Sequence, residues 1–242
     1  GWEVIPAREA PVLFLRTPAM EGLPCPVRGG SLRLLSNHLN IREGDFPLLA
    51  GYLVQAISPA GPYPILNWQG EQGTGKTTAS EIVRSVIDPS SVPTRSAPRS
   101  GRDLVVAARN VWVLVFDNLS GLPKWLSDCF CRLSTGGGFG VRQLYTDRGE
   151  DLFFGMRPLI LNGIDEVATR GDLVDRCLII RLDPIDPTNR RTQAEVMAEF
   201  RADHPEILGA LLDAASMALR RRDEVVLKQL PRMADFAKWV VA

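Results

Sequence analysis

The residues best suited to chemistry form a glycine-rich run that ends in lysine and threonine. From Gly70 to Thr77 it reads Gly-Glu-Gln-Gly-Thr-Gly-Lys-Thr, which matches the pattern G-x-x-x-x-G-K-[ST]. An apolar run at 65–68 precedes it and an amphipathic run at 77–87 follows, so we expect a strand, a loop and a helix. In that arrangement the loop N–H groups and the helix N-terminus point at phosphate groups. The run therefore predicts a nucleoside triphosphate site.

Roles within this loop follow from the chemistry of its side chains and backbone. Lys76 is expected to reach the β- and γ-phosphates of ATP, and the Thr77 hydroxyl is expected to ligate Mg²⁺. The other expected nucleotide-binding residues are Gly70, Gly73, Thr74, Gly75 and Thr78.

A carboxylate that could hold the metal ends a second expected strand, at 111–117. Val-Trp-Val-Leu-Val-Phe is apolar throughout and ends in Asp117. This is the Walker-B pattern, whose aspartate holds Mg²⁺ beside the phosphate-binding loop. The next residue is Asn118, where many ATPases of this class carry a glutamate. Because asparagine can orient water but cannot take its proton, Asn118 predicts slow hydrolysis or a base from elsewhere.

Alternating strands and helices must position these residues. Strands are expected at 64–68, weakly at 92–96, and at 111–116, 158–161 and 177–182, with helices at 77–87, 102–109, 124–133 and 171–175. Continuous apolar strands separated by helices predict a parallel sheet covered on both faces. The expected fold class is therefore α/β, a P-loop NTPase sheet of the AAA+ (ASCE) kind with an inserted β-hairpin at 141–156 and a C-terminal helical part.

Three regions are expected along the chain. They are a strand-and-helix region at 1–60, an ATPase core at 61–186 and a helical subdomain at 187–242. Within the first region we expect two short strands in 2–16, then helices at 31–40 and 45–57; within the last we expect helices at 195–202, 205–221 and 233–241. The abrupt start at Gly1, before a strand-like stretch, indicates a fragment of a longer protein.

Composition excludes several classes of protein. Hydrophobic residues make up 45% and charged residues 23%, the balance of a soluble globular chain, and no apolar run is long enough to cross a bilayer. Four scattered cysteines and two histidines form no zinc pattern, and they indicate a reducing, cytoplasmic location. The formal net charge is zero, so the chain as a whole is not expected to attract nucleic acid.

Residues after the Walker-B strand narrow the choice among P-loop proteins. Thr135-Gly136-Gly137, then Arg142 and Asn162, follow the order of a Thr-Gly-Gly turn, an arginine-bearing hairpin and a strand that ends in asparagine. Over residues 63–184 the chain resembles the superfamily 3 helicase core, most closely that of poxvirus-type and phage-type primase–helicases. The resemblance implies an ATPase from a phage or other mobile element that acts on DNA, forms a homo-oligomer such as a hexameric ring and is linked to a primase.

The resemblance also implies roles for individual residues. Asn162 would be the polar sensor that holds the lytic water or the γ-phosphate. Arg176 would be the arginine finger that reaches the ATP of a neighbouring subunit, with Arg170 as the competing choice. Arg232, in the helical C-terminal part, is a further candidate γ-phosphate sensor, although a packing role fits it equally well.

The expected hairpin leaves two functions open. In a helicase it would contact nucleic acid through Arg142, Tyr145 and Arg148. Its acidic residues balance its arginines, however, and its tip reads Asp-Arg-Gly-Glu where this family usually has lysine or histidine. The order of the motifs favours a DNA motor. The neutral hairpin and Asn118 favour an ATP-gated assembly or scaffold module that hydrolyses ATP poorly and does not unwind DNA.

Overall fold

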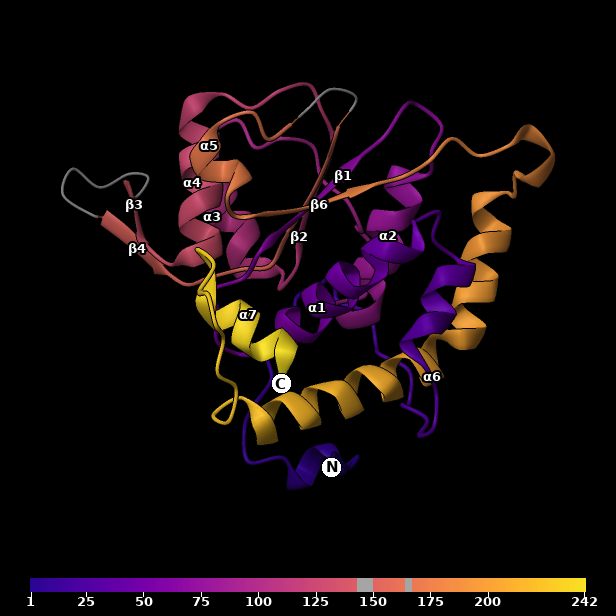
Figure 1. The fold of residues 1–242 in the computed structure, drawn as a ribbon. Coiled ribbons are helices and arrows are strands. Elements are labelled where there is room, and N and C mark those ends of the chain that lie inside the picture. The colour runs from indigo at the N-terminus through magenta and orange to yellow at the C-terminus, as the bar shows by residue number, and fades with distance from the viewer. Residues whose placement is uncertain (143–149, 164–166) are drawn as a thin grey trace.

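The computed structural model describes residues 1–142, 150–163 and 167–242, with only the backbone described at 141–142 and 150–152. A four-stranded parallel sheet lies at its centre, in the order β2-β5-β1-β6 (Figure 1). Its strands are β1 (Ile65–Gln69), β2 (Leu114–Leu119), β5 (Leu159–Gly163) and β6 (Cys177–Arg181). Because the strands are parallel, their carboxyl ends share one edge, where Trp68 of β1 pairs with Asn162 of β5.

Helices cover both faces of the sheet because successive strand residues point to opposite sides. Leu66 and Trp68 belong to one buried core, and Ile65 belongs to the other. The first core packs against α1 (Phe46–Ala56), α2 (Lys76–Ile87), α6 (Gln193–Arg221) and α7 (Ala234–Val241). The second packs against α3 (Gly101–Asn110), α4 (Lys124–Thr135) and α5 (Gly171–Val174). The predicted α/β class, with a parallel sheet covered on both faces, is confirmed.

A small antiparallel hairpin projects from the second core, as the sequence predicts. Its strands are β3 (Gly138–Arg142) and β4 (Glu150–Phe154). β3 begins three residues before the expected start because Phe139 is buried against Phe153, with their ring centroids 6.2 Å apart. The buried aromatic pair anchors the base of the hairpin in the core.

The N-terminal strands expected in 2–16 are wrong. The only regular element there is a 3₁₀ turn at Ala7–Glu9, and Leu13, Phe14 and Leu15 are 98%, 78% and 92% exposed. A strand needs a neighbour for its backbone groups, and no described residue pairs with this segment in a ladder. The weak strand expected at 92–96 is likewise reduced to a single bridge between Arg95 and Phe116, and the helix expected at 31–40 is a 3₁₀ helix, η2 (Leu32–Asn37).

The C-terminal region holds one long helix, α6, where two helices were expected. α6 begins with a capping box between Thr192 and Glu195 and continues through Pro205. Proline removes one backbone hydrogen bond from a helix and usually bends it. Figure 1 shows α6 changing direction part-way along its length. Burial of Phe200 before the proline and of Ile207 and Leu211 after it keeps both halves packed on the same core.

All three expected regions contribute to that core. Leu35 and Leu49 come from 1–60, Val83 comes from 61–186, and Phe200 and Trp239 come from 187–242. The boundaries near 60 and 186 stay a proposal about organisation along the chain. In the described parts of the chain, no helix is long and apolar enough to span a membrane.

Candidate functional site

The P-loop, residues 70–77, connects the carboxyl end of β1 to the start of α2. Gly73 and Gly75 have φ angles of +83° and +86°, a left-handed conformation that glycine adopts without strain. At Gly70 a Cβ atom would lie 2.8 Å from the Leu182 carbonyl oxygen. Side chains at these positions would strain or block the loop, so the glycines of the motif have a physical reason to be glycine.

Lys76 lies folded over this loop. Its Nζ donates to the Gly70 carbonyl oxygen at 2.6 Å and to the Glu71 carbonyl oxygen at 2.8 Å. Burial lowers the pKa of the ammonium, and the nearby Asp117 carboxylate opposes that effect. Neutral carbonyls are weaker partners for an ammonium than phosphate oxygens are. The lysine is therefore held where an anionic phosphate would be a stronger partner.

The predicted catalytic side chains meet in a hollow beside the P-loop. This cavity has a volume of about 290 Å³ and is called the P-loop hollow. It is lined by Gln72, Gly73, Gly75, Lys76, Thr77, Thr78, Asp117, Asn118, Asn162 and Gly163. These residues come from β1–α2 and from the carboxyl ends of β2 and β5. Of the predicted catalytic residues, Arg176 alone does not line the hollow.

The hollow contains suitable oxygen ligands for Mg²⁺. Thr77 is exposed and Asp117 is partly exposed, and both line the cavity. A hydroxyl and a carboxylate are the hard ligands that this ion prefers. Thr77 and Asp117 would hold Mg²⁺, which would neutralise charge on the phosphates.

Asn118 adopts a left-handed backbone conformation, with φ +56°. Its N–H is shared between Asp117 Oδ1 at 2.7 Å and Asn162 Oδ1 at 3.1 Å. Asparagine is several-fold enriched among non-glycine residues at positive φ. Asp117 is the only carboxylate among the described residues that line the hollow. Among the described residues that line the hollow, no glutamate stands beside the predicted metal-binding aspartate.

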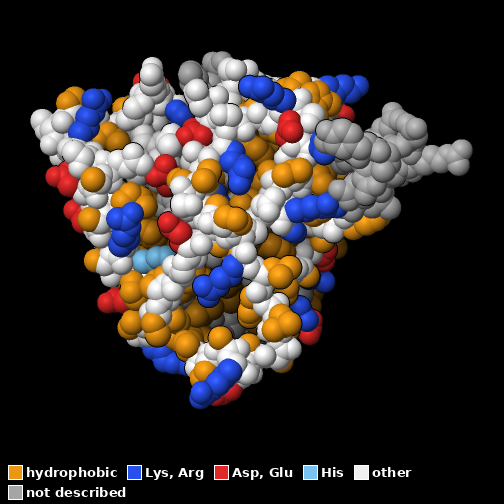
Figure 2. All heavy atoms as spheres, turned by 180° about the vertical axis from the view of Figure 1, so that it is seen from behind, with side chains coloured by type: hydrophobic (Ala, Val, Ile, Leu, Met, Phe, Trp, Pro, Cys, Tyr) orange, Lys and Arg blue, Asp and Glu red, His pale blue; other side chains and the backbone are white. Residues whose placement is uncertain are grey.

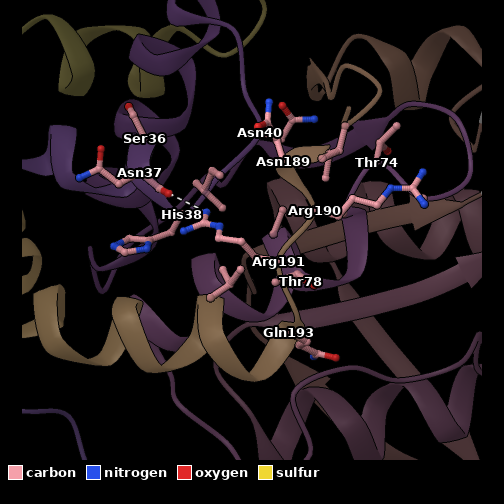
Figure 3. A pocket seen from close by; sticks show the side chains of 16 residues that line it. Ser36, Asn37, His38, Asn40, Thr74, Thr78, Asn189, Arg190, Arg191 and Gln193 are labelled. Atoms are coloured by element: carbon pink, nitrogen blue, oxygen red, sulfur yellow. Dashed lines mark hydrogen bonds between the residues drawn. The ribbon is translucent and has the colours of Figure 1, made fainter. Parts of the chain in front are cut away.

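A second hollow of about 550 Å³ adjoins the first across the P-loop. Both are lined by Gly73, Gly75 and Thr78. The walls of the second also come from η2 and its continuation (residues 36–40) and from the segment between β6 and α6 (Figure 3). Buried Thr74 faces this side, and its hydroxyl donates to the Glu71 carbonyl oxygen at 2.9 Å. The two hollows together offer space on both sides of the P-loop.

Arg190 is a possible ligand contact that sequence reasoning missed. Figure 3 shows its exposed side chain extending toward Thr74, whereas Arg191 extends toward Asn37. Arg191 donates to the Asn37 carbonyl oxygen at 2.9 Å and pairs with Glu199. Arg190 has no hydrogen bond or ion pair among the described residues. The only signal in the sequence was a pair of arginines after the last core strand, which does not distinguish the two.

The sequence matches the model of a known protein family. The sequence model of the actinomycete integrative conjugative element replication proteins matches residues 32–242, which is most of the chain. The chain belongs to this family. It is therefore a replication protein, and the match begins at η2 and includes the P-loop, the Walker-B strand and the C-terminal helices. No curated protein matches the chain in sequence.

Solved structures of the NrS-1 C-terminal region share the fold of this replication protein. The A-form apo structure of the NrS-1 C-terminal region is 15% identical, with a TM-score of 0.55, over 82% of this chain and 48% of that chain. A second apo structure of the same region is 14% identical, with a TM-score of 0.50, over 82% and 49%. A JCV helicase structure is 11% identical, with a TM-score of 0.39, over 83% and 61%. The chain thus spans about half the length of the NrS-1 structures, and the predicted resemblance in fold is confirmed.

The predicted arginine finger of this replication protein lies away from the P-loop hollow. Arg176 is partly buried, and its Nη1 donates to the Asp172 carbonyl oxygen. Arg170 forms ion pairs with Asp128 at 3.1 Å and with Asp172 at 3.4 Å. Arg232 pairs with Asp175 in the same way, at 2.7 Å. An arginine finger acts on a neighbouring subunit, so the role of Arg176 stays a prediction.

The predicted nucleic-acid residues lie in the hairpin. The backbone of Arg142 pairs with that of Glu150 in the β3–β4 ladder, while Tyr145 and Arg148 lie outside the described residues. On the face shown in Figure 2, basic and acidic side chains are interspersed without a continuous basic surface among the described residues. DNA contact through this hairpin therefore stays a prediction.

Proposed function

We propose that this replication protein binds ATP with Mg²⁺ and hydrolyses the ATP to act on DNA. The observation that carries the proposal is the meeting of Lys76, Thr77, Asp117 and Asn162 in one hollow. These are a phosphate-binding ammonium, two metal ligands and a polar amide, which together are the parts that phosphoryl transfer to water needs. Membership in a replication protein family supports DNA as the target.

The two adjoining hollows support a binding mode for the nucleotide. The triphosphate would lie in the P-loop hollow, against the N-terminus of α2, where N–H groups and the helix dipole favour anions. The ribose and base would lie in the second hollow, whose walls include Leu39 and Ile185. Arg190, which lines the second hollow and extends toward Thr74 (Figure 3), would contact the part of the nucleotide that lies there.

Calorimetry with ATP and Mg²⁺ tests the proposal. Lys76→Ala removes the ammonium that now bonds to Gly70 and Glu71, and binding should become undetectable. Lys124→Ala is the matched control because Lys124 is exposed at the start of α4 and lines neither hollow. Unchanged ATP affinity in Lys76→Ala would contradict the site assignment.

One observation favours a second function, an ATP-gated scaffold that hydrolyses poorly. Asn118 stands next to Asp117, and no other carboxylate lines the described part of the hollow. A scaffold of this kind would change its assembly when ATP binds, without turnover. Turnover that single-stranded DNA accelerates would support the motor, whereas ATP-dependent assembly without turnover would support the scaffold.

A further inference from the structure

A buried chain of hydrogen bonds joins α2 to the ends of β5 and β2. Ser80, which is 0% exposed, donates its hydroxyl hydrogen to the Lys76 carbonyl oxygen at 2.9 Å. The same Ser80 Oγ accepts from Asn162 Nδ2 at 3.0 Å. Asn162, which is 2% exposed, accepts at Oδ1 from the Asn118 N–H at 3.1 Å. The chain thus connects the P-loop helix to the residue that follows the Walker-B aspartate.

The two neighbours of the Asn162 amide select the same orientation. The single hydroxyl hydrogen of Ser80 is already donated to Lys76, so Ser80 faces the amide with a lone pair and requires its Nδ2 end. The backbone N–H of Asn118 is a donor only, so it requires the Oδ1 end. A reversed amide would place donor against donor and acceptor against acceptor in a buried site, which is costly.

We propose that Ser80 is a positioning residue that holds the Asn162 amide in its working orientation, an inference that rests on the proposed ATP site. Nδ2 carries two hydrogens, and only one of them has an acceptor among the described residues. Because Asn162 lines the P-loop hollow, the second hydrogen is the group that can bond to the terminal phosphate or to the attacking water. Ser80, together with the Asn118 N–H, fixes the amide so that a donor, rather than an acceptor, faces the reaction.

A bond from a helical serine to the carbonyl four residues earlier is common and needs no functional reason. The hydrogen bond between Ser80 and Asn162 is different because it joins α2 to β5 and fixes which end of the Asn162 amide faces Ser80. If Asn118 were its only partner, the Asn162 amide could still rotate about the hydrogen bond that its Oδ1 makes with the Asn118 N–H. Two fixed partners are needed to hold both ends.

A double-mutant cycle in the full chain separates positioning from general support of the fold. ATP affinity is measured by calorimetry, and kcat and KM by a sensitive phosphate-release assay. Ser80→Ala should lower kcat about tenfold at unchanged ATP affinity, the size of one lost hydrogen bond. Ser80→Thr keeps the hydroxyl and should retain most of the rate. In an Asn162→Ala background, Ser80→Ala should cause no further loss, because its only route of action is gone.

Ser134→Ala is the matched control, since Ser134 is also 0% exposed and donates to a backbone carbonyl oxygen, that of Tyr63, at 2.6 Å. It should leave kcat unchanged. A normal kcat in Ser80→Ala, an additive loss in the double variant, or a loss of ATP affinity alone would each overturn the inference. A wild-type chain that binds ATP without turnover would overturn this inference and leave the nucleotide site in place. Absence of ATP binding would overturn the proposed function itself.

Discussion

The backbone of Asn118 explains why a glutamate would fit poorly beside Asp117. Its φ of +56° lies in the left-handed region, where most side chains cost about 1–2 kcal/mol and only glycine, asparagine and aspartate are common. The conformation brings its N–H to both Asp117 and Asn162. The turn that brings this N–H to both side chains therefore disfavours glutamate at position 118.

Asn118→Asp is the substitution that adds a base without disturbing this turn. Aspartate tolerates the left-handed region, and its carboxylate could accept the proton of the attacking water. We expect turnover at saturating ATP to rise about tenfold or more, less than the roughly 10²–10⁴-fold of a well-placed base, because the side chain is short. Asn118→Gly is the control, since it relaxes the backbone and adds no base. An aspartate variant no faster than the glycine variant would show that the missing base does not limit the rate.

The sequence was enough to predict that the P-loop residues lie together, because a strand, a loop and a helix follow one another along the chain and bring them together locally. Asp117 followed because it ends an apolar strand of a parallel sheet, whose strands end at one edge. Asn162 was predicted from the resemblance to the superfamily 3 helicase core. Ser80 and Arg190 were missed for a physical reason. The partner of Ser80 lies 82 residues away, and its contact depends on how α2 packs against β5. The spacing of residues along the chain does not predict this contact.

The chain before η2 lies across α6 just after its proline. The Val27 N–H donates to the Pro205 carbonyl oxygen at 2.9 Å. A Cβ atom at Gly209 would lie only 1.7 Å from the Val27 carbonyl oxygen, and one at Gly30 would lie 2.3 Å from the Glu206 carbonyl oxygen. The two glycines allow backbone to touch backbone, so this crossing fixes where α6 lies.

Gly209→Ala should therefore destabilise the fold. In an ordinary helix interior this change stabilises by about 0.8–1.0 kcal/mol. Here the added carbon would overlap a backbone oxygen, and we expect a net loss of about 2–3 kcal/mol in the free energy of unfolding. Urea denaturation measures it. Gly101→Ala is the control, because a Cβ at the start of α3 meets nothing within 4 Å. Equal stability of Gly209→Ala and wild type would show that the backbone at Val27 moves to make room for the added carbon without loss of stability.

We expect His204 to make the docking of α6 sensitive to acid. It is buried and stacked on Phe200, with ring centroids 4.9 Å apart. Burial lowers its pKa from the ordinary 6.5, opposed in part by a hydrogen bond with the Val86 backbone. Below that ordinary value the unfolded chain binds a proton that the folded chain resists, so stability is complete above it and falls as the pH drops.

We expect the melting temperature of wild type to fall more than that of His204→Phe between about pH 7.5 and about pH 5.5. Phenylalanine keeps the stack on Phe200 and removes the titrating group. The other titratable groups are the same in both proteins. Equal losses in the two proteins would remove His204 as the cause.

Element prediction failed where tertiary contacts decided the outcome. The apolar run from Val12 to Leu15 suits a strand, yet a strand forms only when another backbone pairs with it, and none of the described residues does so. Pro205 is a reasonable helix end by local rules. α6 continues through it because the apolar residues on both sides are buried in one core.

At the scale of the whole molecule, charge limits how the protein could hold DNA. The net charge is zero, and the face in Figure 2 mixes acidic with basic side chains. A general attraction to phosphate is therefore absent from that face. DNA binding by such a molecule would depend on a few local contacts, and the hairpin is the element that the resemblance assigns to them.

The hairpin decides between the motor and the scaffold. If the motor is correct, Arg142→Ala/Tyr145→Ala should weaken binding of single-stranded DNA in the presence of ATP, since stacking of a base on an aromatic ring is worth about 1–3 kcal/mol. Affinity should depend only weakly on salt, because few phosphates are neutralised. Fluorescence anisotropy at two salt concentrations measures both effects, with Arg8→Ala, an exposed arginine of the N-terminal turn, as the control. Equal DNA affinity of the double variant and wild type, with ATP binding intact, would remove the hairpin from the mechanism and favour the scaffold.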